Sequence, residues 1–388
     1  MSFHLTARRA LFGLLAFLAL VAIGCGDDGG SDTSGGASAG SAESDYVEQV
    51  KADVEQHYTG TYTGPPDAAP AAEPGKNVWI ISAGQAATIS VMATGGAEDA
   101  AEALGWETTI YDGKFDPAEW ANGIRQAIAD GADGIVLYLI DCNLVRGPLT
   151  QARKAGITVV AGESIDCNET DPDQESLFDG MPEYVEGTYA EWIKEYGRLQ
   201  AQWLIAQTDG EAHVLYPRTD EVQGYTLIRE GAEEELAKCP DCSIEYYEWR
   251  QADLGPQLRQ KTEQALLRNP NANAMILPLD AMATAGVGAA LTATGRRDML
   301  VIGAEGEEAN IEMIKEDDPG MDAGVGIPTR YEGFAMMDVL LRLFADEKPA
   351  PSGMGLQIYD AEHNLPESGT YQAPVDFETA YLEAWGAK

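Results

Sequence analysis

ADGADGIVLYLIDCNLVRGPLTQARKAGITVVA, residues 129–161, is the stretch of this sequence that decides the fold. Residues 135–140 form a continuous apolar run, residues 144–155 have a helical pattern, and residues 158–161 form a second apolar run. Two short apolar strands joined by a helix predict neighbouring parallel strands in a sheet covered on both faces. Because such crossovers are right-handed, the carboxyl ends of the strands lie at one edge of the sheet.

The same alternation extends in both directions from this stretch. Upstream, the pattern predicts strands at 78–82 and 108–111 and helices at 89–104 and 117–129. Acidic and aromatic residues interrupt it at 166–196. Downstream, helices are predicted at 199–207, 227–237, 257–268 and 282–294, and strands at 213–216, 244–248, 274–277 and 300–302. The sequence therefore predicts an α/β protein of two Rossmann-like lobes with parallel sheets, and ligands of such folds bind beyond the strands' carboxyl ends.

Residues 1–24 have the features of an export signal. Arg8 and Arg9 precede an apolar run at 10–23, and about fourteen residues at ~1.5 Å each are too short to span a bilayer permanently. The segment VAIGC, residues 21–25, resembles the lipobox of bacterial lipoproteins, which implies cleavage before Cys25 and lipid on that residue. An ordinary secretory signal that happens to contain a cysteine is the alternative.

Residues 25–75 are predicted to be a lipidated flexible tether with one short helix. Residues 26–43 contain almost no large apolar group and cannot offset the entropy of ordering. The helix is indicated by the spacing of Tyr46, Val47, Val50 and Val54. A second loose stretch, rich in Pro, Gly and Ala, is predicted from 59 to 75, and the folded body is expected to begin at Asn77.

The chain is strongly acidic. Its 388 residues include 64 acidic and 25 basic side chains, for a net charge of −39, and removal of the two signal arginines takes the mature chain to −41. Nucleic acid and anionic membrane surfaces are therefore excluded as partners, so the membrane is reached through the lipid anchor alone. A solvated acidic surface of the kind that suits saline surroundings accounts for this charge, and a cationic ligand is the alternative.

Motifs for catalysis or cofactor binding are missing from the sequence. The four histidines do not pair at metal spacing, and neither a G-x-S-x-G elbow nor a phosphate-binding G-x-x-x-x-G-K-[ST] loop occurs. The first strand-to-helix turn, residues 82–86, lacks the glycines of a dinucleotide site. We expect no enzyme activity, metal or cofactor, and a glycosidase-like pair of carboxylates is the alternative that the abundant acids leave open.

Polar and aromatic residues follow the predicted strands, where a ligand in a cleft would lie. They are Ser82, Gln85, Asp141, Glu163, Tyr216, Arg218, Trp249, Arg250, Asp280 and Glu305. Carboxylates accept hydrogen bonds from adjacent hydroxyls, guanidinium groups donate in a fixed fork, and aromatic rings cover the C–H face of a sugar. Such a set suits a neutral polyhydroxylated ligand, and its acids would also suit an amine.

Five motifs carry a resemblance to a known family. In chain order they are GAE through ALG (96–105), ADGADGI (129–135), AGITVV (155–160), RNPNA (268–272) and VIGAEG (301–306). Their order and spacing resemble the type I periplasmic solute-binding proteins of the ribose and galactose branch, the receptors of sugar ABC transporters. The resemblance runs from about residue 77 to residue 358 and implies two lobes that close on a ligand about a three-strand hinge.

The resemblance implies a division of the chain and a set of binding residues. The first lobe would comprise residues 76–188 and 329–352 and the second lobe residues 189–328 and 353–388, with crossings near 183–194, 326–330 and 351–357. The family's ligand carboxylates fall on Glu163, Asp280 and Glu305. Two arginines expected in the family are replaced by Ser164 and Ile228, and the aromatic residues expected after the first strand by Ala87, Thr88 and Ile89. Arg330 is expected to restore one guanidinium.

The four cysteines besides Cys25 are predicted to form two disulfides. Cys142 and Cys167 follow neighbouring strands of the first lobe, so a bridge between them would pin the rim of the cleft, and Cys239 and Cys242 would clip one turn. A redox motif or half a zinc site is the alternative for the second pair. The predicted function is a monomeric, lipid-anchored receptor that delivers a sugar or polyol to an ABC transporter permease. A sensory binding protein and an exported hydrolase are the alternatives.

Overall fold

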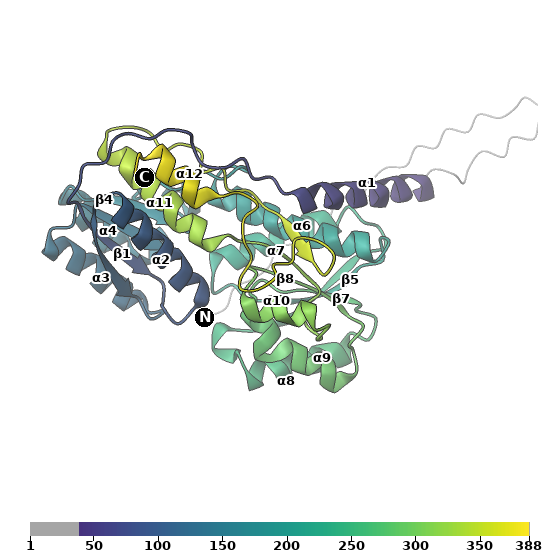
Figure 1. Cartoon of the computed structure of the whole chain (residues 1–388). Helices are drawn as coiled ribbons and strands as arrows, with labels where there is room; N and C mark the ends of the chain where they lie inside the picture. The colour runs from purple at the N-terminus through teal and green to yellow at the C-terminus, as the bar shows by residue number, and fades with distance from the viewer. Residues whose placement is uncertain (1–38, 388) are drawn as a thin grey trace, which may run out of the picture.

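Two β-sheets with helices on their faces form the part of the chain that can be described (Figure 1). The structure is a computed structural model and describes residues 39–387. The predicted signal segment, residues 1–24, and the lipidation site Cys25 lie outside the described residues. The predicted α/β class with two mostly parallel sheets is confirmed.

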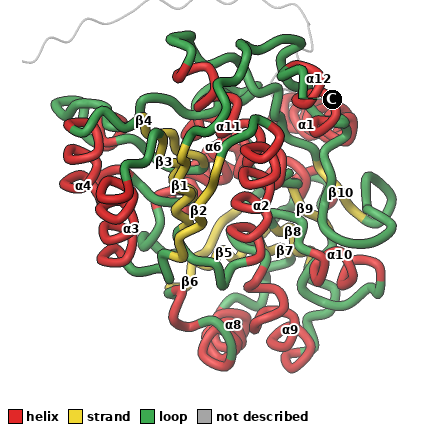
Figure 2. Tube along the Cα trace, turned by 60° about the vertical axis from the view of Figure 1, so that its left-hand side comes forward, coloured by secondary structure: helices red, strands yellow, loops and turns green. Residues whose placement is uncertain are grey.

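The first lobe contains a four-stranded parallel sheet in the order β2-β1-β3-β4. Its strands are β1 (Asn77–Ser82), β2 (Glu107–Asp112), β3 (Gly134–Tyr138) and β4 (Thr158–Gly162). Its helices include α2 (Thr88–Ala103), α3 (Pro117–Asp130), α4 (Cys142–Lys154) and the short α5 (Cys167–Thr170). The inner strands are almost wholly buried, as their continuous apolar runs predict, and β2 is the partly exposed edge strand (Figure 2).

Helix α3 shows how local sequence determines the ends of these elements. The Asp116 side chain accepts a hydrogen bond from the backbone N–H of Ala118 at 2.8 Å, and Pro117 occupies the first helical position. Gly131 ends the helix in the left-handed conformation (φ 72°), which glycine adopts without a steric penalty. The chain then enters β3 at Gly134.

The second lobe contains a six-stranded sheet in the order β10-β9-β8-β7-β5-β6, in which only the β9–β10 pair is antiparallel. Its strands are β5 (His213–Arg218), β6 (Ser243–Glu248), β7 (Ala274–Ile276), β8 (Leu300–Gly303), β9 (Ala323–Val325) and β10 (Ile358–Asp360). Its helices are α6 (Tyr189–Gln207), α7 (Gln223–Leu236), α8 (Pro256–Arg268), α9 (Gly288–Thr294) and α10 (Glu308–Lys315).

Two sequence predictions for this lobe need correction. Helix α6 begins at Tyr189 rather than at Leu199, because Thr188 and Glu191 form a capping box, with the Glu191 carboxylate 2.8 Å from the Thr188 backbone nitrogen. The helix predicted at 282–294 begins with a π-helical turn at Ala283–Val287 before α9. Glycines allow α6 and α7 to pack closely, since a Cβ atom on Gly231 would lie only 1.9 Å from the backbone oxygen of Lys194.

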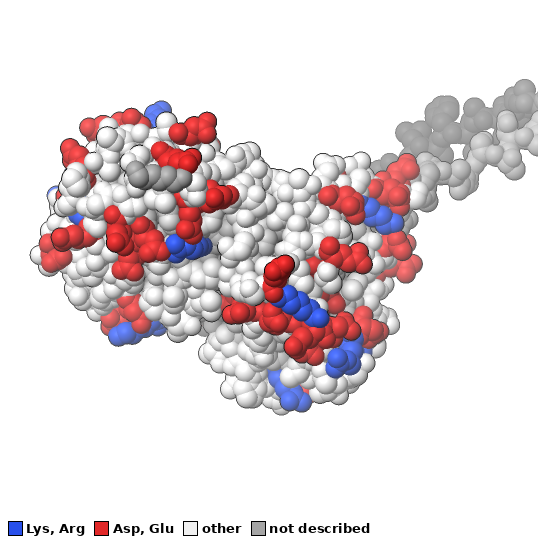
Figure 3. Space-filling view, viewed as in Figure 1, with Lys and Arg blue, Asp and Glu red and all other residues white. Residues whose placement is uncertain are grey.

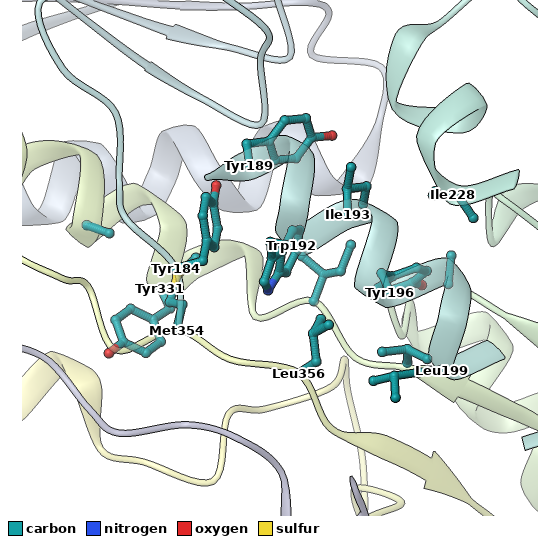
Figure 4. Packing of buried hydrophobic residues seen from close by; sticks show 14 of the residues in the cluster. Tyr184, Tyr189, Trp192, Ile193, Tyr196, Leu199, Ile228, Tyr331, Met354 and Leu356 are labelled. Atoms are coloured by element: carbon teal, nitrogen blue, oxygen red, sulfur yellow. The ribbon is translucent and has the colours of Figure 1, made fainter. Parts of the chain in front are cut away.

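Three chain segments join the lobes and hydrogen-bond to one another. The backbone N–H of Ser352 donates to the carbonyl of Glu183 at 2.8 Å, and the N–H of Val185 donates to the carbonyl of Met354 at 2.8 Å. The N–H of Gly326 donates to the carbonyl of Gln357 at 2.9 Å. Side chains from the start of α6 pack against Met354 and Leu356 of the third segment (Figure 4). The three segments therefore form one bonded and packed hinge.

The helix after the second crossing belongs to the first lobe. Helix α11 (Thr329–Phe344) lies against α2, where a Cβ atom on Gly333 would be 2.4 Å from the carbonyl of Ala93. Since α11 begins at Thr329, the strand-like crossing predicted at 326–330 ends before it. The last helix, α12 (Phe377–Ala384), packs on α11, and the Trp385 indole that follows it donates to the Asp338 carboxylate at 2.9 Å. Residues 353–388, which were assigned to the second lobe, are therefore divided between the lobes. Strand β10 joins the sheet of the second lobe, whereas α12 packs on α11 of the first lobe.

The N-terminal segment is bonded to both lobes rather than loose. Helix α1 (Ala39–Thr59) buries Val47, Val50 and Val54 and packs on α6 of the second lobe, so the predicted helix is present but longer. Residues 60–75, the N-terminal strap, contain no regular secondary structure.

Hydrogen bonds to its backbone groups fix the N-terminal strap at successive points. The N–H of Thr61 donates to the carbonyl of Leu356 in the hinge at 3.0 Å. The Arg342 guanidinium of α11 donates to the carbonyl of Ala68 at 2.8 Å, and the Trp106 indole donates to the carbonyl of Glu73 at 2.9 Å. The prediction of a second loose stretch at 59–75 is therefore wrong, because its Pro and Gly residues disfavour helix and strand without preventing hydrogen bonds to the rest of the protein.

Both predicted disulfides form. Cys142 at the start of α4 is bonded to Cys167 at the start of α5, and Cys239 is bonded to Cys242. The first disulfide joins the segments that follow β3 and β4, and the second closes the turn between α7 and β6. Both sulfur atoms of the second pair are used in this bond, and the described residues offer no zinc grouping around them.

Candidate ligand-binding site

Glu163 is the first candidate residue, at the carboxyl end of β4. Its backbone is in the left-handed region (φ 44°), which non-glycine residues seldom adopt and which often marks functional positions. The side chain is 6% exposed, and the Tyr138 hydroxyl of β3 donates to its Oε1 at 2.9 Å. The parallel sheet of the first lobe therefore fixes this carboxyl group from two adjacent strands.

Glu332 of α11 faces Glu163, and we call these two residues the carboxyl pair. The Tyr184 hydroxyl donates to Glu332 Oε1 at 2.7 Å. The absence of a side chain on Gly162 makes room for this approach, since a Cβ there would lie 2.6 Å from Glu332 Oε1. Glu332 Oε2 is buried without a hydrogen-bond partner.

Burial controls the ionisation of the carboxyl pair. It raises the pKa of Glu163 above its ordinary value, against the lowering effect of the hydrogen bond from Tyr138. Burial and, next, the charge of Glu163 raise the pKa of Glu332 further. The pair therefore retains protons at a pH at which exposed glutamates are ionised, unless a positive charge enters the site.

Asp280, after β7, organises the loop that carries the second lobe's carboxylate. Its side-chain oxygens accept the backbone N–H groups of Ala304, Gly306 and Glu307 at 2.8, 2.8 and 2.9 Å. Burial raises its pKa to about 6, although these three hydrogen bonds favour the charged form. Asp280 was predicted as a ligand contact, and the structure gives its carboxylate a positioning role in the loop after β8.

Glu305 lies on that loop and is 9% exposed. The backbone N–H of Asp280 donates to its Oε2 at 2.8 Å, which orients the side chain. Burial and then the charge of Asp280 raise its pKa well above the ordinary value, and the charge of Glu163 in the other lobe contributes in the same direction. Carboxyl groups from the two lobes are thus within electrostatic reach of each other.

Tyrosines from α6 and α7 lie among these carboxylates. After burial, the charges that raise the pKa of Tyr196 most are those of Glu305 and Asp280, and Glu163 also contributes. The hydroxyl of Tyr196 is fully buried and has no hydrogen-bond partner. The pKa of Tyr189 is raised by burial and then by Glu163 and Asp141. Figure 4 shows both tyrosines on the first turns of α6, with Trp192 between them.

The lobes also approach each other at Thr88, at the start of α2, and Glu307, before α10. Burial raises the pKa of Glu307, and the Thr88 side chain acts against this rise. Tyr225 of α7 is near enough to Glu305 and Glu163 for both charges to raise its pKa after burial. The site is therefore enclosed by groups from both lobes and from the hinge end of α6.

The structure places the other predicted contacts as follows. Ser82 and Gln85 bond to each other, with Gln85 Nε2 donating to Ser82 Oγ at 2.8 Å. Asp141 accepts the backbone N–H of Ile165 at 2.9 Å and thereby joins the loops after β3 and β4. Trp249 is buried beside Tyr225 with its indole N–H unpartnered.

Arg330 is a salt-bridge residue that connects α11 to two other helices. Its guanidinium contacts Asp99 of α2 at 2.6 Å and Glu378 of α12 at 2.5 Å. The guanidinium expected for the ligand site is therefore already paired with two carboxylates. Arg218 is partly exposed and Arg250 fully exposed, so neither supplies a buried cation.

The carboxylates of this site have no cationic partner in residues 39–387. Within that range, the nitrogen of every Lys, Arg and His side chain lies farther than 4.0 Å from the carboxylate oxygens of Glu163, Glu332, Asp280 and Glu305. The molecular surface is also acidic, and Figure 3 shows more acidic than basic side chains on the face in view. The site is accordingly rich in acceptors and tyrosine rings.

The same part of the chain offers one grouping of metal-ligand type, Cys142, Asp166 and Cys167. Both sulfur atoms are in a disulfide, and Asp166 accepts the backbone N–H groups of Cys167 and Leu177 at 2.7 and 3.0 Å. These donors are therefore already used in the protein's own structure. From residue 39 to residue 387, no helix has the length and apolar character to cross a membrane.

The sequence analysis missed Glu332. It is 169 positions beyond Glu163 in the chain and inside a helix, so no strand-end pattern identifies it. One feature of the sequence could have identified Glu332: it is the single charged residue within the otherwise apolar run YEGFAMM, residues 331–337. A buried charge among apolar residues is unfavourable, so its presence there indicates a functional role.

The two lobes, the bonded hinge and the interlobe group of polar residues define a solute-binding fold. The model of the periplasmic binding protein domain matches residues 79–348, well over half of the sequence, and the chain belongs to this family. This is a family of extracytoplasmic proteins. No curated protein matches the chain.

Solved structures with the same fold include several transporter proteins. A solute-binding protein from Burkholderia graminis in complex with D-arabinose has a TM-score of 0.65 and 15% identity, covering 76% of this chain and 99% of that one. An ABC sugar transporter subunit from Rhodobacter sphaeroides has a TM-score of 0.63 and 19% identity, covering 75% and 99%. A solute-binding protein from Agrobacterium vitis with bound allitol has a TM-score of 0.62 and 19% identity, covering 74% and 95%. The predicted family and fold are confirmed.

Proposed function

We propose that this protein is an extracytoplasmic receptor that captures a small polyhydroxylated solute between its lobes and delivers it to an ABC transporter permease. The observation on which the proposal depends is that Glu163 and Glu305 follow β4 and β8, in opposite lobes, and are both at least nine-tenths buried. A ligand bonded to both would favour the closed arrangement, because binding free energy can shift the open–closed equilibrium only through contacts that differ between the two states. The ligands named for the related structures, an alditol and a pentose among them, support the solute class.

We assign ligand contact to Glu163, Glu332, Glu305 and the hydroxyl of Tyr196, and a supporting role to Asp280. Ser82, Gln85, Asp141 and Trp249 stay predicted contacts. A monomer anchored through lipid on Cys25 fits a receptor that must stay near its permease, and two lipid attachments are needed for stable retention.

A thermal-shift screen over sugars, alditols, nucleosides and amines tests the receptor function. A ligand at one hundred times its dissociation constant adds about 2.7 kcal/mol of stability, which for a chain of this size corresponds to roughly 5 °C in melting temperature. The matched comparison is Glu163→Gln, which should reduce the shift, against Glu308→Gln at an exposed position in α10, which should not. If no compound in the screen raises the melting temperature, the proposal fails.

Sensing and hydrolysis are distinguished by separate measurements. For a sensory protein, ligand binding would persist, and uptake into cells would be unchanged when the chromosomal copy is deleted. For a hydrolase, the two acids would act on a glycoside, and turnover of nitrophenyl glycosides would be lost in Glu163→Gln or Glu305→Gln. Turnover by the wild-type protein would replace the receptor assignment.

A further inference from the structure

The chemistry of the interlobe site indicates more than a polyhydroxylated solute. Three carboxyl groups, those of Glu163, Glu332 and Glu305, are at least nine-tenths buried and form no ion pair in the described part of the chain. They come from the end of β4, from α11 and from the loop after β8, and Glu332 Oε1 lies beside Gly162, the residue that precedes Glu163. Carboxylates buried without a cation are unfavourable, so their retention points to a counter-charge that arrives with the ligand.

Two polar atoms add independent evidence that a ligand enters this space. The Tyr196 hydroxyl belongs to a fully buried residue and has no partner, although the Glu305 and Glu163 charges both act on it. Glu332 Oε2 is likewise buried without a donor, on a residue that is 1% exposed. Buried polar atoms are normally paired, and an unpaired donor and acceptor within one cluster match a ligand that both accepts and donates.

The aromatic residues of the site favour the same kind of ligand. Tyr189 and Tyr225 lie near the carboxylates, and Trp192 stacks on Tyr184 with ring centroids 4.7 Å apart. The face of such a ring attracts an ammonium group, while its apolar area covers C–H bonds. A cluster of carboxylates and rings is the usual chemistry for recognising an organic cation.

A metal ion explains the cluster less well. The oxygens of Asp280, the best-placed further acid, already accept three backbone N–H groups. Among residues 39–387, the carboxylates of the site do not meet the spacing of a metal grouping. An ammonium group carried by a hydroxylated ligand has three N–H donors and needs only two or three acceptors around it, fewer than a metal ion needs ligands.

We infer that the ligand of this site is a cationic polyhydroxylated molecule, an amino sugar or amino alditol, whose ammonium group lies between Glu163 and Glu305 near the hydroxyl of Tyr196. The inference rests on the proposed receptor function and specifies its ligand. The net charge of −39 acts in the same direction, because it raises the local concentration of cations around the protein.

Matched pairs of compounds that differ by one ammonium group test the inference. The pairs are D-glucosamine with D-glucose, D-galactosamine with D-galactose, and 1-amino-1-deoxy-D-glucitol with D-glucitol, and N-acetyl-D-glucosamine serves as an uncharged derivative. Isothermal titration and thermal shift at pH 7.5 measure each compound on the mature protein. We expect the amine to bind at least tenfold more tightly than its neutral partner, a difference of about 1.4 kcal/mol.

Two variants locate the charge. Glu305→Gln keeps an oxygen that can accept the Asp280 N–H, and Glu163→Gln keeps one for the Tyr138 hydroxyl, so each can fold while losing a charge. Either variant should reduce the ratio of the amine's affinity to that of its neutral partner at least tenfold. The control, Glu308→Gln, lies three residues beyond Glu305 and is exposed.

Each outcome decides one of the two proposals. If the neutral partner binds as tightly as the amine, or if both Glu→Gln variants keep the preference, the cationic ligand is refuted and the receptor stands. A thermal shift with calcium chloride alone as large as that with any amine would replace the ammonium by a metal ion. If no member of any pair binds, the receptor function for such solutes is refuted together with the inference.

Discussion

Replacing Glu332 by glutamine tests whether the carboxyl pair is held protonated in the folded protein. Glutamine has the shape of a protonated glutamate, so its oxygen can accept the Tyr184 hydroxyl that Glu332 accepts at 2.7 Å. The substitution removes the acid and leaves the packing of α11 unchanged. The variant should therefore be more stable than the wild-type protein at high pH and similar to it at low pH.

The magnitude follows from the pKa of Glu332, which is raised from 4.5 to about 8 by burial and then by the charge of Glu163. Below about pH 4.5 the native and unfolded states both hold the proton, and this residue has no effect on the pH dependence. As the pH rises from 5 to 8, the unfolded chain releases the proton while the native state keeps it, so wild-type stability falls. At about 1.36 kcal/mol per pK unit, the advantage of Glu332→Gln grows by roughly 3 kcal/mol over this range.

Urea unfolding followed by tryptophan fluorescence, at pH 5 and pH 8, measures this difference. The wild-type protein, Glu332→Gln and the exposed control Glu308→Gln are compared in the same buffers, and the control should follow the wild type at both values. The reasoning is refuted if the free energy of unfolding of Glu332→Gln differs from that of the wild type by the same amount at both pH values.

Three other predictions concern binding, covalent stability and packing. Affinity for an amine should rise between pH 5.5 and pH 8 and binding should release protons in calorimetry, because the carboxyl pair must ionise; a pH-independent affinity would contradict this. Replacing Cys142 and Cys167 by alanine should lower the free energy of unfolding by about 3.5 kcal/mol, because the disulfide closes a loop with a sequence separation of 25 residues. The midpoint of urea unfolding measures this loss, and an unchanged midpoint would contradict the prediction. Gly231→Ala should destabilise the folded protein by about 3 kcal/mol, because the new Cβ would clash with the backbone carbonyl of Lys194. The control is Gly147→Ala, where no atom lies within 4 Å of the added Cβ, and this change should be neutral or stabilising in the same assay.

The sequence predicts most strands because their apolar runs are short, continuous and regularly spaced. It does not predict α11, whose residues are buried on nearly every side and which therefore lacks the polar face that marks a helix. It misplaces the start of α6, although the Thr188–Glu191 capping box is legible once it is sought.

The site could be predicted only where strand ends identify it. Glu163 and Glu305 come directly after strands, and topology alone brings such residues to one edge of each sheet. The role of Asp280 could not be predicted, because it depends on three backbone N–H directions in another loop. Arg330 was assigned to the ligand on position alone, and its salt bridges to Asp99 and Glu378 come from segments that are distant in sequence.

The N-terminal strap has a consequence for how far the lobes can separate. It continues from α1, which packs on the second lobe, and it is bonded to the first lobe through Ala68 and Glu73. A rotation that opens the cleft must therefore break bonds at one end of the strap or bend the strap itself. Two hydrogen bonds at about 1 kcal/mol each would change the ratio of open to closed molecules about thirtyfold. The affinity of the proposed receptor would thus depend partly on residues that never touch the ligand, and a shortened protein beginning at Asn77 would have a different equilibrium from a chain that keeps the strap.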